Sequence, residues 1–438
     1  MTSTPAGHLG SPDDRQRASL RRALARWRGS HGPPAPLSSP AGDHRTTPVG
    51  RAAGDDIELA DVELLRQGRP GVLDVVAEMD GRLAHAVFGL RRPGDELHLV
   101  GTVEEPTLGL VEDEAGIAVL VDALHDADAA PLLLDAVAGD TGRIREARRA
   151  PGAGRGAHPP GAAAPTARPV TRSAFRGTGR SAVAMLRDDD DVVALVFGQR
   201  CSLSVFPWLW RGPHPGVTFL AALDEAGFNH LAAPVAIWRR AGRDLGVVQE
   251  VLPGASSGWA LAVASLRDML AAGCSPDAAG GDFAPEALAL GRMAARMHLA
   301  LDRAFGRRSG ERPPAIRTHG DFHLGRTART DAGWVLADCM PGGTKPGSDE
   351  PVYRSPLADV ADMVWSFHHA AVVATSERGP GTAASRPAEL AQAWEARNRR
   401  AFMAGYLSTP GIGGLVPADR GAVRGLVAVF EAARAVRG

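Results

Sequence analysis

The sequence predicts an α+β protein of two lobes, with a small α/β cap ahead of the first lobe. Three observations support this fold class. Strand-like alternation fills two separate regions of the first 250 residues, a Gly/Ala/Pro/Arg-rich stretch lies between them, and amphipathic helical patterns dominate after Trp259. The length fits, because 438 residues are enough for two or three domains.

Changes in composition divide the chain into five segments. In the first, residues 15–28 can form a short helix, although Gly, Pro, Ser and Arg dominate around it. The segments are residues 1–54, expected to be disordered; 55–150, the cap; 151–168, a linker; 169–253, a β-rich lobe ending in a single-segment hinge; and 254–438, a helical lobe.

The cap carries a clear hairpin signal. Two alternating segments, residues 72–79 and 83–90, flank Asp80-Gly81, a dipeptide typical of tight turns between antiparallel strands. The other elements expected in the cap are a strand at residues 96–103 and a helix at residues 115–136 with a break at Pro131.

The two lobes show the same kinds of pattern. In the β-rich lobe we expect strands at residues 182–186, 192–197 and 247–251, a turn at 188–191, and a helix at 218–226 that ends near Gly227. In the helical lobe we expect helices at residues 261–272, 285–304, 356–374, 388–406 and 420–437, and short strands at 327–330 and 334–337.

Composition argues against several classes of protein. The formal net charge is −1, so neither nucleic acid nor an anionic membrane is the expected partner. Three widely spaced cysteines make neither a disulfide framework nor a zinc site, and they fit a reducing compartment. No signal-peptide pattern opens the sequence, and no apolar run approaches the roughly 20 residues of a membrane span. We expect a cytoplasmic protein that is a monomer or a weak homodimer.

Candidate chemistry is concentrated in one loop. Residues 318–326 read Thr-His-Gly-Asp-Phe-His-Leu-Gly-Arg, and a second acid, Asp338, follows after a short hairpin. In phosphoryl transfer one carboxylate accepts or orients the proton of the attacking hydroxyl, and another holds Mg²⁺ against the phosphates. Asp321 and Asp338 suit these two roles, but acids in loops are common, so their spacing alone does not name a reaction.

The same loop resembles the catalytic loop His-Gly-Asp-x-His-x-Gly-Gln of actinobacterial maltokinases and their relatives. These are small-molecule kinases with the bilobal, protein-kinase-like fold of aminoglycoside phosphotransferases. The similarity continues in order over residues 57–437, with matching stretches at residues 249–254, 290–301 and 355–367. It implies a kinase fold with an N-terminal cap.

Two features favour a kinase of monosaccharides or amino sugars. The cap, at residues 80–85, 89–91 and 122–124, looks more like that of actinobacterial glucosamine kinases. Maltokinases also follow the metal-binding acid with Phe-Glu-Gly-Glu-Pro, whereas residues 339–343 here read Cys-Met-Pro-Gly-Gly.

The resemblance implies a role for each matching residue, with ATP and Mg²⁺ as cofactors and a small sugar as partner. Asp321 would be the catalytic acid, and Asp338 would bind Mg²⁺. His319, His323, Arg326 and Asp359 would support the loop; Gln249, Glu250, Val251, Arg200 and Ser204 would contact the nucleotide, with the turn at residues 177–181 over its phosphates; and Asp321, Asp349, Glu350, Asp362 and Trp365 would contact the sugar.

Three positions depart from the family pattern. Arg326 replaces a Gln that serves as second metal ligand, and a guanidinium has no lone pair to offer a cation, although it can contact phosphate. The strand Lys that pairs with phosphates is missing, and Thr218 stands in place of its partner Glu. Losing both members of that pair leaves neither charge unpaired.

Two functions therefore remain open. The first is an ATP-dependent sugar kinase, for which glucosamine, phosphorylated on its 6-hydroxyl, is the first expected acceptor and maltose or an aminoglycoside the alternatives. The second is a kinase-fold protein with weak or no phosphotransfer that acts as a binding protein.

Overall fold

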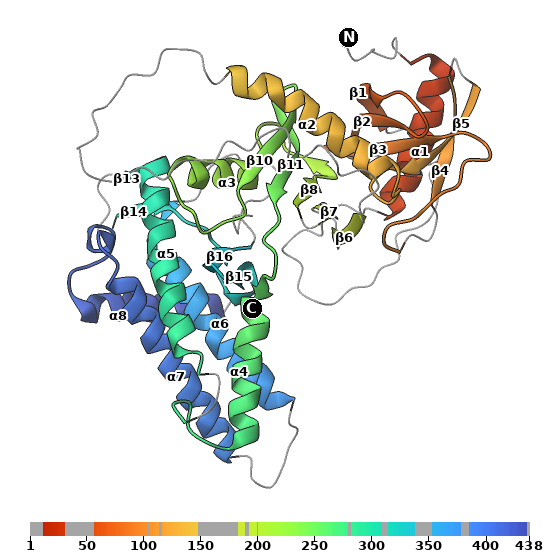
Figure 1. The fold of residues 1–438 in the computed structure, drawn as a ribbon. Helices are drawn as coiled ribbons and strands as arrows, with labels where there is room; N and C mark the ends of the chain where they lie inside the picture. The colour runs from red at the N-terminus through yellow and green to blue at the C-terminus, as the bar shows by residue number, and fades with distance from the viewer. Residues whose placement is uncertain are drawn as a thin grey trace. The chain divides into compact units, whose positions relative to one another are not determined.

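The computed structural model describes residues 12–30, 57–102, 106–113, 116–147, 183–188, 192–198, 200–278, 282–308, 314–337, 353–377 and 385–435. It splits into two compact units (Figure 1). Unit 1 comprises Met1–His214 and Val235–Val251, and unit 2 comprises Pro215–Pro234 and Leu252–Gly438. The predicted cap and most of the β-rich lobe thus fall in unit 1, whereas the helix after His214 falls in unit 2.

The first sheet of unit 1 is antiparallel, with the strand order β1-β2-β3-β5-β4, and β9 pairs with β3. The hairpin expected between its second and third strands is confirmed, because Asp80 and Gly81 both adopt positive φ, 53° and 74°. The strands are β1 (Ile57–Arg66), β2 (Gly71–Met79), β3 (Arg82–Arg91), β4 (Thr107–Asp113), β5 (Gly116–Asp122) and β9 (Trp208–Leu209).

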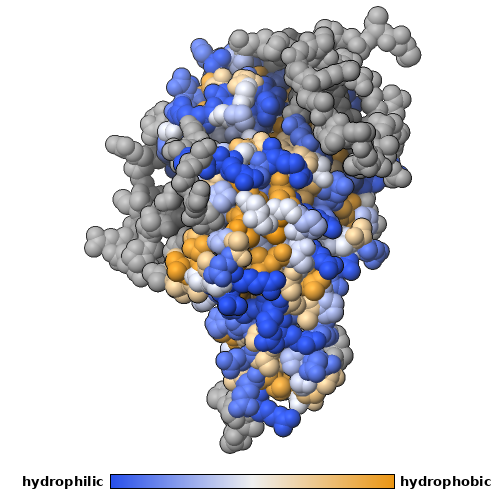
Figure 2. Space-filling model, turned by 90° about the vertical axis from the view of Figure 1, so that its left-hand side faces the viewer, coloured by the Kyte–Doolittle hydropathy of each residue, from blue (hydrophilic) through white to orange (hydrophobic). Residues whose placement is uncertain are grey.

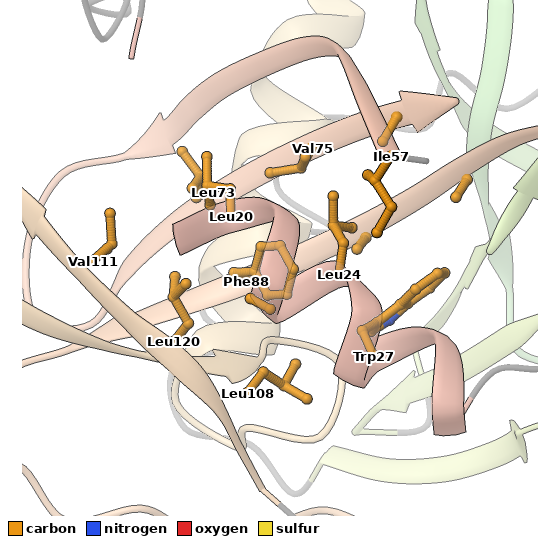
Figure 3. Packing of buried hydrophobic residues seen from close by; sticks show 14 of the residues in the cluster. Leu20, Leu24, Trp27, Ile57, Leu73, Val75, Phe88, Leu108, Val111 and Leu120 are labelled. Carbon is orange, nitrogen blue, oxygen red and sulfur yellow. The ribbon is translucent and has the colours of Figure 1, made fainter. Parts of the chain in front are cut away.

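Helix α1 (Asp14–Ser30) covers one face of this sheet. Its Leu20, Leu24 and Trp27 are at most 3% exposed and join one core with residues of the strands such as Phe88 (Figure 3). The short helix was expected, but disorder throughout residues 1–54 is wrong for α1. The surrounding polar composition concealed a stripe of apolar residues at helical spacing that finds a sheet to cover.

Helix α2 (Ala129–Ala147) covers the opposite face. A Cβ added at Gly89 of β3 would lie 3.5 Å from the Cβ of Ala129, so sheet and helix approach closely there. The two faces of the sheet are therefore both buried, which explains why β2 and β3 read as nearly continuous apolar runs.

Two sequence predictions in the cap are wrong. Residues 116–122 form strand β5 where a helix was expected, because a short apolar run with alternate Ile and Val fits a buried strand as well as a helix. Pro131 lies in the first turn of α2, where its missing N–H breaks no helical hydrogen bond. In the described part of residues 96–103, pairing is limited to the bridge between Leu99 and Asp126.

The second sheet of unit 1 has the order β10-β11-β8-β7-β6. The strands expected on both sides of the acidic turn are confirmed as β6 and β7, which pair with each other. The strands are β6 (Val183–Asp188), β7 (Val193–Phe197), β8 (Cys201–Val205), β10 (Pro234–Arg240) and β11 (Arg243–Glu250).

Unit 2 is mainly helical, and α5 packs along α7 with α4, α6 and α8 beside them (Figure 1). The closest approach uses two glycines, because a Cβ on Gly291 would overlap the backbone of Phe402 and one on Gly405 that of Leu288. All five predicted helices of the helical lobe are confirmed. Unit 2 contains α3 (Pro215–Glu225), α4 (Gly258–Ala272), α5 (Ala284–Phe305), α6 (Leu357–Ser376), α7 (Ser385–Leu407) and α8 (Arg420–Ala435).

Two small sheets in unit 2 frame the predicted loop. One has the order β12-β15-β16 and the other β13-β14-β17. Their strands are β12 (Ser256–Ser257), β13 (Arg307–Arg308), β14 (Ala315–Arg317), β15 (Thr327–Thr330), β16 (Gly333–Leu336) and β17 (Tyr353–Arg354).

The surface is mixed in character. Figure 2 shows hydrophobic residues interspersed among hydrophilic ones on the face it draws. Among the described residues, no helix has both the length and the apolar character needed to cross a membrane.

Candidate active site

The predicted loop lies in unit 2 between β14 and β15, and it ends in the 3-10 helix η2 (Leu324–Arg326). Gly320 has a φ of 81°, a left-handed conformation that side chains with a Cβ rarely adopt. At the start of α4, a Cβ on Gly258 would lie 2.8 Å from the carbonyl oxygen of Leu324. The loop is therefore tightly turned before Asp321 and closely packed after it.

Asp359 of α6 anchors the loop through hydrogen bonds from the loop backbone. Its Oδ2 accepts a hydrogen bond from the backbone N–H of His319 and its Oδ1 one from that of Gly320, both at 2.8 Å. Asp359 is fully buried, so these two hydrogen bonds to its carboxylate fix the backbone of the loop immediately before Asp321.

Two further buried side chains complete this support. His298 of α5 lies with its Nε2 3.1 Å from Asp359 Oδ2 and its Nδ1 2.8 Å from the hydroxyl of Tyr406 on α7. Burial alone would raise the pKa of Asp359, but the hydrogen bond and charge of His298, with the charges of His319 and Arg354, outweigh it and lower the pKa. The carboxylate therefore stays ionised inside the unit.

Asp321 lies among cationic side chains. Arg326 Nη2 is 3.2 Å and His323 Nε2 is 3.5 Å from Asp321 Oδ2. On the other oxygen, Oδ1, Arg434 Nη2 approaches to 3.3 Å. The hydrogen bond from His323, together with the charges of His323 and Arg326, lowers the pKa of Asp321 despite its partial burial. Asp321 is therefore a carboxylate at neutral pH and a weak proton acceptor.

Arg434 is a site residue that the sequence analysis missed. It lies on α8, which packs against α6, and its Nη1 is 3.0 Å from Asp362 Oδ1 and 3.4 Å from Asp321 Oδ1. Burial raises the pKa of Asp362 to about 6, although the charge of Arg434 opposes the shift. Nothing in the local sequence of α8 distinguishes Arg434 from its other arginines, because only the packing of the helix selects one of them.

Of the predicted sugar-contacting residues, the structure brings Asp321 and Asp362 together through Arg434. Trp365 lies one turn after Asp362 on α6 and is half-buried, with its ring 5.1 Å from that of His368. The other predicted positions, Asp338, Asp349, Glu350 and the turn at residues 177–181, lie outside the described residues.

The described residues do not by themselves make a magnesium site. Among them no group of three or more His, Cys, Asp or Glu side chains could hold a metal ion. At the position expected to supply a second metal ligand, Arg326 instead places a guanidinium against Asp321.

The predicted nucleotide-contacting residues gather in unit 1, at the end of the β8–β11 pair. Val251 donates its N–H to the carbonyl of Arg200 at 3.1 Å, and Glu250 and Gln249 pair with the first residues of β8. Ser204 lies further along, opposite Val247. Four of the five residues thus lie at one end of the β8–β11 ladder.

Chemically, the unit 2 loop presents an ionised carboxylate in a fixed direction, next to two guanidinium groups. Such a carboxylate can accept a hydrogen bond from a hydroxyl and orient it, and guanidinium groups suit phosphate oxygens.

Comparison with known proteins points in one direction. No protein-family model matches the chain. It is 28% identical to the glucosamine kinase of Streptacidiphilus jiangxiensis over an alignment of 356 residues. This alignment covers 66% of this chain and 77% of that protein. Among solved structures, a crystal form of glucosamine kinase matches with a TM-score of 0.58 at 19% identity, covering 97% of this chain and 94% of the other. Glucosamine kinase in complex with glucosamine, ADP and inorganic phosphate matches with a TM-score of 0.57 at 17% identity, covering 98% and 94%. The chain thus has a fold shared with glucosamine kinases and a sequence similar to one of them.

Proposed function

We propose that the protein transfers the γ-phosphoryl group of ATP to a hydroxyl of a small sugar, with glucosamine converted to glucosamine 6-phosphate. The observation that carries this proposal is the position of Asp321. Its loop is fixed by two backbone hydrogen bonds to the buried Asp359, and its carboxylate is ionised. A kinase of alcohols needs such a group beside the attacking oxygen.

Similarity supports the choice of acceptor and donor. The sequence resembles a glucosamine kinase, and a solved relative of the same fold holds glucosamine and ADP. Within that fold, we propose the bilobal arrangement of aminoglycoside phosphotransferases, with unit 1 containing the nucleotide lobe and unit 2 the acceptor lobe. A cytoplasmic location agrees with ATP as donor.

The proposed mechanism depends on orientation more than on basicity. Asp321 accepts a hydrogen bond from the sugar hydroxyl and directs its oxygen in line with the γ-phosphorus. A carboxylate with a lowered pKa is a poor base, but the largely dissociative transition state of phosphoryl transfer needs little proton removal until late. Arg326 donates from Nε and Nη2 to Asp321 Oδ2, and a guanidinium group is also suited to contact a phosphate oxygen.

For the nucleotide we propose backbone contacts from Glu250 and Val251, with Gln249, Arg200 and Ser204 nearby. For Mg²⁺ we propose Asp338 as the protein ligand, completed by phosphate oxygens and water, as is common for this ion. The metal would neutralise charge on the phosphates.

Replacing the carboxylate of Asp321 tests the proposal. The change Asp321→Asn removes the negative charge that orients the hydroxyl, so we expect kcat with glucosamine and ATP to fall by on the order of 10²–10⁴. Formation of ADP and of glucosamine 6-phosphate is measured in parallel. Asp331→Asn, on the exposed turn between β15 and β16, is the matched control and should retain activity.

Wild-type-like turnover by Asp321→Asn would contradict the assigned role. A second function, a binding protein with weak or no phosphotransfer, is favoured by one observation: Arg326 occupies the expected metal-ligand position and pairs with Asp321. That function predicts little or no turnover by the wild type, together with no Mg²⁺-dependent thermal stabilisation by ATP.

A further inference from the structure

The C-terminal helix brings a cation into the acceptor region. Arg434 is the second-last residue of α8 and contacts two carboxylates with a single nitrogen, Nη1, which lies 3.0 Å from Asp362 Oδ1 and 3.4 Å from Asp321 Oδ1. These two oxygens are therefore close enough to each other for one small cation to bridge them. The guanidinium is that cation in the structure.

Charge balance explains why this position needs a cation. Asp362 is 7% exposed at its side chain and Asp321 25% exposed, so neither is fully hydrated. Asp359, the third acid of the region, already receives two backbone hydrogen bonds and pairs with His298. Removing Arg434 without replacement would leave Asp362 as a buried carboxylate without its partner, which is costly.

An amino sugar carries a suitable replacement. Its ammonium group has the same charge as the guanidinium and three N–H donors, so it can take over the contact with Asp362 Oδ1 while the 6-hydroxyl, at the other end of the sugar ring, faces Asp321. Exchange of one cation for the other leaves the net charge of the site unchanged. Arg434 can withdraw, because its side chain is 28% exposed, its contacts with Asp321 are 3.3 and 3.4 Å long, and α8 ends one residue later.

We propose that Arg434 is a specificity-determining residue that occupies, as an internal cation, the place beside Asp362 that the ammonium group of the amino sugar takes on binding. The inference rests on the proposed function, since it concerns the acceptor of the same reaction. Arg434 competes for this place only with sugars that carry an ammonium group. A neutral sugar gains nothing from its removal, because such a sugar offers no cation to Asp362.

The change Arg434→Gln tests this competition. Gln keeps a polar side chain but is shorter and uncharged, so we expect the ratio of kcat/KM for glucosamine to that for glucose to rise at least five-fold, through a lower KM for glucosamine. Arg434→Lys should return the ratio toward the wild-type value. Arg424→Gln, on the exposed side of the same helix, is the matched control and should leave the ratio unchanged.

The outcomes separate the possible roles. If Arg434→Gln lowers kcat/KM for both sugars by the same factor, or leaves the ratio unchanged, Arg434 supports the fold or the chemistry in general and the proposal is overturned. If the wild type phosphorylates neither sugar, the proposed function is wrong. The competition between Arg434 and the ammonium group of the sugar is then tested by a binding measurement on the wild-type protein.

Hydrogen exchange in the wild-type protein provides a second test. It applies both when the wild type phosphorylates neither sugar and when the Arg434→Gln variant does not fold. Millimolar glucosamine should accelerate amide exchange in the last turn of α8, where Arg434 is released, and millimolar glucose should not. Equal exchange with both sugars would overturn the proposal.

Discussion

At the scale of single residues, three acids in one unit have three different environments. Asp359 has a lowered pKa because His298 and neighbouring charges outweigh its burial, and Asp321 has a lowered pKa because His323 and Arg326 face it. Asp362 has a raised pKa of about 6 because burial dominates. The same type of side chain thus anchors a loop at Asp359, presents an ionised carboxylate at Asp321 and pairs with α8 at Asp362, depending on what touches it.

The raised pKa of Asp362 predicts a pH-dependent loss of stability. Below about pH 4 the group is protonated in both folded and unfolded chains. Between about pH 4 and 6 it ionises in the unfolded chain first, so its contribution to stability falls as pH rises through the folded pKa. Ionised Asp362 then costs on the order of 3 kcal/mol above pH 7.

Asp362→Asn should remove this slope. We expect the difference in unfolding free energy between the variant and the wild type to grow from pH 4 to about pH 6.5 in favour of the variant, and to stay constant above pH 7. Denaturant titrations at several pH values measure it. A difference that does not vary with pH would refute the burial argument, and Asp331→Asn provides the control for loss of an exposed carboxylate.

At the scale of elements, the contact between α5 and α7 in unit 2 depends on glycines, which have no Cβ. Gly291 of α5 and Gly405 of α7 allow the two helices to meet backbone to backbone, where any Cβ would overlap the partner. Because α5 carries His298 and α7 carries Tyr406, this spacing also sets the support of Asp359.

Gly291→Ala should therefore destabilise unit 2. The added methyl forces the helices apart, at a cost of about 1–3 kcal/mol, more than the gain in helix propensity can offset. Gly425→Ala on α8, where nothing lies within 4 Å, is the matched control and should be neutral or slightly stabilising. Thermal melts compare the two, and equal melting temperatures would contradict the close approach.

Elements were also the scale at which sequence reasoning worked best. Helices with a clear apolar stripe and the hairpin at Asp80-Gly81 were predicted correctly, because their signals are local. Strand β5 was mistaken for a helix, since its pairing with β3 and β4 is not visible in five apolar residues. In the candidate site, the loop and Asp359 were predicted through resemblance, whereas Arg434 depends on where α8 packs, which no local pattern encodes.

At the scale of the whole molecule, each unit has its own core. In unit 1, α1 supplies Leu20, Leu24 and Trp27 to a cluster that the strands alone would leave open to solvent. In unit 2, the core forms where α5, α6 and α7 meet. Substitutions in one core should therefore be felt first within that unit.

Leu24→Ala tests this expectation. Leu24 is fully buried, so the cavity should cost about 2–5 kcal/mol. Hydrogen exchange measured by mass spectrometry should accelerate in peptides of α1 and of β1 to β5. Peptides of α5 and α7 should be protected as in the wild type. Equal acceleration in both units would show that they unfold together.

The place of α1 in the core has a consequence for synthesis of the protein. During translation α1 leaves the ribosome well before the sheet that it covers, because the last strand in contact with that core, β9, ends at Leu209. At the usual pace of synthesis this leaves an amphipathic helix without its complete partner for roughly 9–36 s. During that interval the apolar stripe of α1 is exposed and can bind a chaperone. Misassembly through this helix is therefore a hazard of the nascent chain more than of the finished fold.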